Sequence, residues 1–240
     1  MVTYTDDVFA PLDRDHVLER IAGGNETEVY RTDDQRYVVK VKDDLAGDVP
    51  GALQWARRMR AAAEKYVACL GPRNSIASYY LVARDTTGRA HALVIQPFVQ
   101  GARPLSQVDY AALTPAERAE IAAELEAIIR RSVAFYRETG SMPDLYGRSS
   151  TSSEERARLN RPHMLPRRLW SFLVRRNLLR SHNLMLTEDP SRPVVLIDYD
   201  LVRKGRLYRR VYYTVRRALF LRDRVLLAWM RRGGAVPLGD

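Results

Sequence analysis

Two aspartates stand close together in an apolar stretch near the end of the chain. VVLIDYDLV, residues 194–202, has the composition of a buried strand, yet it contains Asp198 and Asp200. On a strand this spacing puts both carboxylates on one face, where like charges repel and are costly to bury. Two interpretations are open. Either the strand ends at Asp198 and Asp200 lies in a solvated loop, or a carboxylate at the strand end holds a metal ion.

Lysine is rare in this chain, which makes two neighbouring lysines informative. The sequence has 35 Arg and 4 Lys, and Lys40 and Lys42 both belong to YVVKVK. On a strand these two side chains share one face, and Val39 and Val41 take the other. The usual role of such a lysine is an exposed strand position. The Arg-rich balance, with a net charge of +10, suits anionic partners or reflects a genome rich in Arg codons.

The bulk composition points to a globular protein of a reducing compartment. At 240 residues with 46% hydrophobic content, the chain can form one large domain or two small lobes. Cys69 is the single cysteine, so no disulfide can form within the chain, and we expect Cys69 to be a core residue. The start of the sequence lacks a secretory signal pattern, and no stretch reaches the ~18 apolar residues of a membrane span. We expect a cytoplasmic protein.

The first hundred residues predict five strands and one helix. Turn residues separate the strand patterns, and Gly71-Pro72 ends the helix. The expected strands are 17–22, 28–32, 36–42 and the hairpin 78–85 and 91–99, and the expected helix is 53–70. Together these elements predict an antiparallel β-rich lobe, residues 1–100.

Beyond Gly101 the pattern becomes mainly helical. A capping box at Thr114 and Glu117 begins a helix predicted over 115–139, which Gly140 ends. A basic amphipathic helix follows in LPRRLWSFLVRRNLLRS, then a strand hairpin around Asp189-Pro190, and then a basic helix over about 207–232. The predicted fold class is therefore α+β, with a second, mainly helical lobe over 101–240.

The turn RIAGGNETEVYR and the strand YVVK resemble two motifs of the protein-kinase superfamily. The turn is similar to the nucleotide-covering loop G-x-G-x-x-G-x-V, with Gly24 at the central glycine and Val29 at the residue that packs on the base. Ala22 and Thr27 occupy the outer glycine positions, and a plain hairpin turn is the alternative. YVVK is similar to V-A-I-K, which makes Lys40 the residue that holds the α- and β-phosphates.

Two further segments of the first lobe fit the same resemblance. Glu64 is the only carboxylate of the helix predicted over 53–70, and the family pairs such a glutamate with the strand lysine. An ordinary pair with Arg60 is the alternative. LVIQPFVQG resembles the hinge between the lobes, where backbone groups around Gln96 and Phe98 would bind the adenine edge. Pro97 has no N–H, so Phe98 and Val99 are the expected donors.

The second lobe supplies the remaining family positions. ETGSMPDLY resembles the segment that leads into the catalytic loop and makes Asp144 the catalytic carboxylate, although Ser149 stands where the family has asparagine. SHNLML then offers Asn183 and VLIDYD offers Asp198 as metal ligands, and oxygen ligands of this kind suit Mg²⁺. Either a segment of about 150–181 is inserted in the catalytic loop and Asp144 still meets Asn183, or the catalytic carboxylate has been lost.

The resemblance implies a small two-lobed kinase-like fold that uses ATP and Mg²⁺. No A-P-E motif occurs, and in this economy the chain is similar to short bacterial members, including lipopolysaccharide-core and other small-molecule kinases. The implied reaction is phosphate transfer to a hydroxyl acceptor, which could be a small molecule, a glycolipid or a protein. The alternatives are a pseudokinase that serves as a nucleotide-binding scaffold and a basic nucleic-acid-binding protein.

The last helical stretch, residues 205–234, allows two roles. We expect one apolar face, formed by Val211, Val215, Leu219, Val225 and Trp229. Cations surround this face at Arg209, Arg210, Arg216, Arg217 and Arg231. The helix could close the second lobe, or it could dock on an anionic membrane surface.

Overall fold

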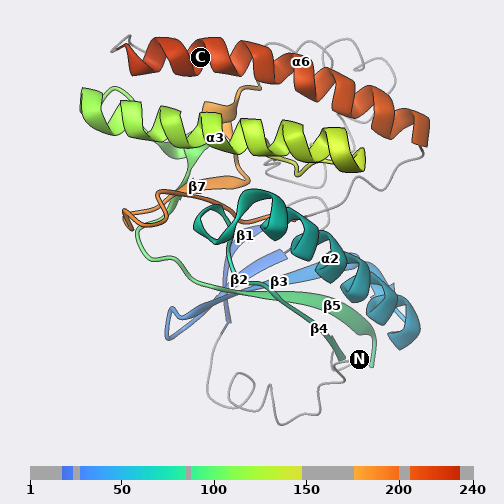
Figure 1. Cartoon of the computed structure of the whole chain (residues 1–240). Coiled ribbons are helices and arrows are strands. Elements are labelled where there is room, and N and C mark those ends of the chain that lie inside the picture. The colour runs from blue at the N-terminus through green and yellow to red at the C-terminus, as the bar shows by residue number, and fades with distance from the viewer. Residues whose placement is uncertain (1–17, 24–27, 85–87, 148–175, 200–205, 233–240) are drawn as a thin grey trace, which may run out of the picture. The chain divides into compact units, whose positions relative to one another are not determined.

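The computed structural model describes residues 18–23, 28–84, 88–147, 176–199 and 206–232 (Figure 1). These residues divide into two compact units. The first contains the described residues up to Glu64 together with Ile76–Gln100, and the second contains Lys65–Ser75 and the described residues from Gly101 onward. The predicted α+β class is confirmed.

The first unit is built on a five-stranded antiparallel sheet, as predicted. The strand order is β1-β2-β3-β5-β4. The strands are β1 (Leu18–Gly23), β2 (Glu28–Thr32), β3 (Tyr37–Gly47), β4 (Tyr79–Arg84) and β5 (Ala90–Pro97). On one face Val39, Leu81, Leu93 and Ile95 form a buried cluster, which the alternation of side chains along a strand predicts. Lys40 lies on the opposite face.

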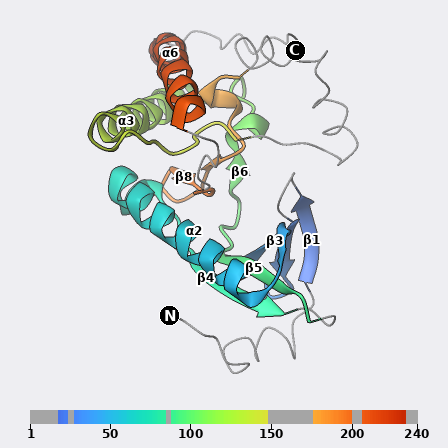
Figure 2. The same cartoon turned by 90° about the vertical axis from the view of Figure 1, so that its right-hand side faces the viewer.

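A long helix, α2 (Val49–Leu70), follows β3 and runs beside the sheet in its first half (Figure 2). It begins earlier than the predicted residue 53 because the Asp48 carboxylate accepts a hydrogen bond from the Gly51 N–H at 3.0 Å. Pro50 is tolerated there, because an N–H group in the first turn of a helix has no acceptor within the helix and its absence loses no hydrogen bond. Near the C-terminal end, Cys69 is half-buried, and burial raises the pKa of its thiol to about 11, as befits a packing residue.

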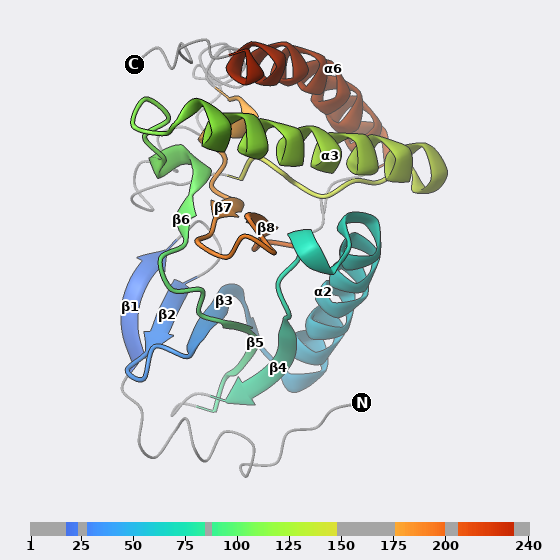
Figure 3. The same cartoon turned by 60° about the vertical axis from the view of Figure 1, so that its left-hand side comes forward.

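Two long helices, α3 (Pro115–Thr139) and α6 (Arg206–Arg231), pack against each other in the second unit (Figure 3). The predicted capping box is present: Glu117 N–H donates to the Thr114 hydroxyl at 3.2 Å, and the Glu117 carboxylate accepts from the Thr114 N–H at 2.7 Å. Gly140 ends α3 with a φ of 69°, a conformation that glycine adopts without strain. The rings of Tyr136 and Tyr213 join the two helices, with centroids 5.5 Å apart.

A small three-stranded sheet lies in the second unit as well. It consists of β6 (Arg103–Pro104), β7 (Leu184–Leu186) and β8 (Val194–Leu196), and β7 and β8 form the predicted hairpin. Short 3-10 helices occur at η1 (Pro72–Asn74), η2 (Leu105–Gln107) and η5 (Leu178–Arg180). The predicted insertion over 150–181 falls outside the described residues except for 176–181, which include η5. Most of the basic amphipathic helix expected there also falls outside them.

Candidate active site

The first group of candidate site residues lies on the face of the five-stranded sheet that carries Lys40, within the first unit. Val29 of β2 is the direct partner of Lys40 in β3, and Lys40 in turn stands opposite Val94 of β5. Residues paired in antiparallel strands point to the same face. The structure therefore brings together the two residues predicted to hold the base and the phosphates. Gly24 of the predicted glycine loop falls outside the described residues.

One of the two backbone donors expected in the hinge segment is already hydrogen-bonded within the first unit. The Phe98 N–H donates to the Arg36 carbonyl at 2.8 Å, which leaves the Val99 N–H as the expected donor to a nucleotide. The Phe98 ring lies 5.5 Å from the Arg31 guanidinium. Gln96 is buried, and its amide donates to the Ser78 hydroxyl at 2.8 Å.

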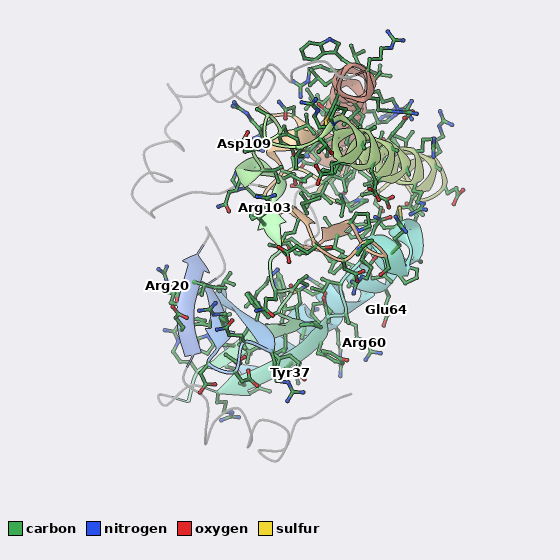
Figure 4. The ribbon with its side chains drawn as sticks, turned by 90° about the vertical axis from the view of Figure 1, so that its left-hand side faces the viewer. Arg20, Tyr37, Arg60, Glu64, Arg103 and Asp109 are labelled. Atoms are coloured by element: carbon green, nitrogen blue, oxygen red, sulfur yellow. The ribbon has the colours of Figure 1, made fainter. Side chains whose placement is uncertain are left out.

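Glu64 takes the alternative partner that the sequence left open. Its carboxylate accepts a hydrogen bond from Arg60, one turn earlier on α2, at 2.9 Å (Figure 4). The Glu64 side chain is 63% exposed. Within the described part of the chain its ion pair is with Arg60, so a pair with Lys40 stays a prediction that the structure does not support.

The second group of candidate site residues belongs to the second unit and includes the loop that contains Asp144. The Asn183 side-chain amide donates to the Asp144 carbonyl at 2.8 Å, which joins residues 39 positions apart in the sequence. Gly147 makes this approach feasible, because a Cβ atom there would lie 2.3 Å from the Asn183 Oδ1 atom. Asp144 and Asn183 thus meet in space, as the insertion interpretation requires.

Ser181 ties the same two segments together. Its buried hydroxyl donates to the Leu145 carbonyl at 2.6 Å and accepts from the N–H groups of Asn183 and Leu184. The His182 N–H donates to the Tyr146 carbonyl at 2.9 Å. These bonds satisfy backbone groups that would otherwise be buried unpaired, so they fix the loop around Asp144 in one conformation.

Asp198 lies beside Asn183 at one end of the β7–β8 hairpin. The Ile197 N–H donates to the Asn183 carbonyl at 2.9 Å, and Asp198 is the next residue, half-buried. A carboxylate and an amide oxygen fit Mg²⁺, which keeps several waters and takes further oxygens from phosphates. No cluster of three His, Cys, Asp or Glu side chains suited to a metal occurs among the described residues, so the pair would need oxygens from a ligand. Asp200 falls outside the described residues.

Arg216 of α6 is the residue beside Asp144 that the sequence pattern does not reveal. It was expected among the surface cations of the last helix, but its side chain is 3% exposed and pairs with the Asp144 carboxylate at 2.7 Å. Its guanidinium lies over the rings of Tyr146 and Tyr212, at 4.4 Å and 4.7 Å from their centroids. Stacking between aromatic faces stabilises a buried guanidinium.

The surroundings of Asp144 keep it ionised. Burial alone would raise the pKa of its carboxyl group, but the charge and hydrogen bond of Arg216 and the N–H groups of Tyr146 and Gly147 outweigh burial and lower the pKa to about 2. The Oδ1 atom accepts from these three donors, whereas Oδ2 accepts from the Tyr212 hydroxyl at 3.3 Å. Oδ2 therefore has room for one more donor.

A second buried contact joins this loop to α6. The Tyr146 hydroxyl donates to the Asp223 carboxylate at 2.5 Å, and the Tyr146 ring stacks on Phe220 with centroids 5.7 Å apart. Asp223 is 1% exposed, and burial raises its pKa. Asp223 is the only acid of α6. A lone carboxylate on the apolar side of a basic helix is the signal that could have revealed this network.

Comparison with known proteins gave remote structural matches. No protein-family model and no curated protein matches the chain. Among solved structures, a MAP kinase from Leishmania major is 11% identical with a TM-score of 0.49, and the match covers 98% of this chain and 61% of that one. The chain thus spans less than two thirds of that kinase.

Two phosphotransferases were also matched. One is APH(2'')-IIIa, solved with GDP and kanamycin, at 16% identity over 93% of this chain and 80% of that one, with a TM-score of 0.43. The other is the spectinomycin phosphotransferase APH(9)-Ia, solved with ADP and spectinomycin, at 14% identity over 83% and 70%, with a TM-score of 0.36. Because every TM-score is below 0.5, the functional assignment rests on the chain's own residues.

Proposed function

We propose that the protein is an ATP-dependent phosphotransferase that acts on a hydroxyl acceptor. The observation that carries this proposal is the hydrogen bond from Asn183 to the carbonyl of Asp144, beside Asp198. This bond supports the proposal because it joins the segment of Asp144, whose carboxylate could orient an acceptor, to the segment of Asn183 and Asp198, whose oxygens suit Mg²⁺. Phosphoryl transfer requires little else from a protein than positioning and charge stabilisation.

The residues of each unit have their own role in this proposal. On the sheet, Val29 would pack on the base, Lys40 would bind the α- and β-phosphates, and the backbone near Val99 would bind the adenine edge. In the second unit, Asn183 and Asp198 would hold Mg²⁺, which supplies neutralisation of phosphate charge.

Asp144 would act on the acceptor through its Oδ2 atom. A hydroxyl that donates to Oδ2 is oriented for attack on the γ-phosphorus, and its proton passes to the carboxylate late in the transfer. The new bond joins the acceptor oxygen to phosphorus, and the bond that breaks joins phosphorus to the leaving ADP oxygen. The low pKa of Asp144 means that orientation and charge, rather than strong basicity, are its contribution.

The ion pair between Asp144 and Arg216 also favours a second candidate, a nucleotide-binding scaffold without transfer activity. A buried guanidinium at 2.7 Å neutralises the carboxylate and weakens it as a base. In this alternative Lys40, Asn183 and Asp198 still bind a nucleotide, but no acceptor is phosphorylated.

Transfer of labelled γ-phosphate from ATP separates the two candidates. The full chain is incubated with Mg²⁺ and a panel of hydroxyl-bearing small molecules, glycolipids and proteins. We expect incorporation that falls by about 10²- to 10⁴-fold in Asp144→Asn, the range for loss of an acid–base group. Asp189→Asn, in an exposed turn of the same unit, is the matched control and should keep full activity. ATP binding without incorporation into any acceptor would support the scaffold instead.

A further inference from the structure

The outward side of α6 carries most of the exposed large hydrophobic side chains in the described part of the protein. The described residues include six exposed large hydrophobic side chains. Four of the six belong to α6: Val211 at 56%, Leu221 at 65%, Val225 at 70% and Trp229 at 41%. Single exposed hydrophobic residues are ordinary on a protein surface, but several on one helix require a reason.

These side chains form a continuous band, which we call the outer stripe: Val211, Ala218, Leu221, Val225, Ala228 and Trp229. All six are exposed, and Thr214 is the polar residue that lies among them. Positions 211, 218 and 225 repeat every seven residues, which returns to nearly the same side of a helix. The opposite side of α6 holds Tyr213, Phe220 and Leu227, all buried. Leu219, expected on the same apolar face as Val211 and Val225, is buried instead.

A row of arginines borders the outer stripe along one side. Arg210, Arg217, Arg224 and Arg231 also follow a seven-residue spacing, one position before the residues of the stripe. Arg231 shares its charge with Glu126 of α3 at 3.1 Å, and Arg217 lies 5.5 Å from the Tyr136 ring. The helix offers no exposed acid, because its single carboxylate, Asp223, is buried beneath it.

We propose that the outer stripe and the arginine row of α6 dock the protein on an anionic lipid surface. This proposal does not depend on the proposed function. The stripe would enter the boundary between headgroups and acyl chains, and the long arginine side chains would reach the lipid phosphates beside it. No described helix is long and apolar enough to cross a bilayer, so the contact is peripheral.

Charge decides against a second copy of the chain on this surface. Two α6 helices that met along their outer stripes would bring two arginine rows together without an acidic partner on either helix, and such like charges oppose pairing. An anionic membrane instead presents a dense sheet of phosphate to the row, with apolar chains below it for the stripe. Both properties of this face are then satisfied at once.

Co-sedimentation of the full chain with vesicles tests the proposal. Vesicles of phosphatidylcholine containing about 30 mol% phosphatidylglycerol are compared at low salt with vesicles of phosphatidylcholine alone. We expect binding to the anionic vesicles that weakens as salt is added. The double variant Leu221→Asp/Val225→Asp should lose detectable binding and keep the circular dichroism and melting transition of the parent, since both positions are exposed.

Matched charge variants separate the arginine row from net charge. Arg210→Gln/Arg217→Gln should bind roughly thirtyfold more weakly, at about five- to sixfold for each arginine. Arg57→Gln/Arg58→Gln, on an exposed part of α2, removes the same charge and should change binding by less than about threefold.

Three results would overturn the proposal. The first is that the parent chain ignores anionic vesicles at low salt. The second is a failure of either comparison: the Leu221→Asp/Val225→Asp variant binds vesicles as tightly as the parent, or the Arg57/Arg58 variant loses as much vesicle affinity as the Arg210/Arg217 variant. The third is sedimentation velocity in which the parent self-associates through α6 and ignores vesicles, which would make this face an interface between copies.

Discussion

The candidate site residues of the two units are held in place in different ways. On the sheet, Val29 and Lys40 are neighbours because β2 and β3 pair in antiparallel register. In the second unit, Asp144 reaches Asn183 across a long sequence separation and is held by Arg216 from a third segment, α6. The first arrangement is a local consequence of the strand ladder, whereas the second depends on buried charges from distant parts of the chain.

This difference implies that the residues on the sheet and the residues around the Asp144 loop respond differently to mutation. A side chain on a sheet face can be replaced without harm to the backbone pairing that presents it. The loop of Asp144 has no such scaffold of its own and is fixed by α6 and by Ser181. Ligand binding and folding should therefore be separable on the sheet and coupled in the loop.

The largest effect is expected for Arg216→Ala. Removal of the buried guanidinium leaves the Asp144 carboxylate with neutral hydrogen-bond donors alone, and it should lower the free energy of unfolding by roughly 3–5 kcal/mol. Arg217→Ala, at the next position and exposed, removes only a cation–π contact and should cost less than about 1 kcal/mol. Urea unfolding of both variants measures the difference. Equal losses of unfolding free energy would show that the ion pair with Asp144 does not stabilise the fold.

A smaller effect is expected for Gly147→Ala. Both Gly147 and Gly140 have positive φ, at 65° and 69°, so alanine costs about 1 kcal/mol at either position. At Gly147 a Cβ atom would also meet the Asn183 side chain, whereas at Gly140 nothing lies within 4 Å. Gly147→Ala should therefore be the more destabilising by about a further 1–2 kcal/mol. A comparison of thermal unfolding decides this, and equal losses would mean that the loop can move away from Asn183.

The smallest effect is expected for Glu64→Gln in the first unit. The exposed pair with Arg60 contributes only about 0.3–0.5 kcal/mol, so unfolding should hardly change. ATP affinity should also stay close to that of the parent, because Glu64 faces solvent beside Arg60. A large loss of ATP affinity with unchanged stability would show that Glu64 does serve Lys40 and that the pair with Arg60 is not the functional one.

Much of the fold follows from short-range patterns in the sequence. Thr114 and Glu117 predict where α3 begins, and alternation around Lys40 predicts which face of β3 is buried. Helix α2 begins earlier than expected because Asp48 caps it ahead of Pro50, and a prediction that treats proline as a helix breaker starts the helix too late. Such local signals determine which secondary-structure elements form and in which register the strands pair. The pairing of Val29 with Lys40 follows from them.

The position of Arg216 could not be predicted in the same way. In the sequence it is one arginine among eight on α6, and nothing local distinguishes it from exposed Arg217. Its burial depends on Asp144, Tyr146 and Tyr212 meeting at one point, which is a property of the packed unit. In the second unit, the motifs therefore predict Asp144, Asn183 and Asp198 but not the residue that holds Asp144 in place.

The central claim is that the sheet face and the Asn183–Asp198 pair bind different parts of one nucleotide. Calorimetric titration with ATP, in Mg²⁺ and in EDTA, tests it most directly. We predict that Mg²⁺ tightens binding to the parent chain, that Asp198→Ala abolishes this gain but keeps binding in EDTA, and that Lys40→Ala weakens binding in both conditions. Asp189→Ala serves as the control. The claim is contradicted if Mg²⁺ has no effect on the parent or if Asp198→Ala retains the full gain.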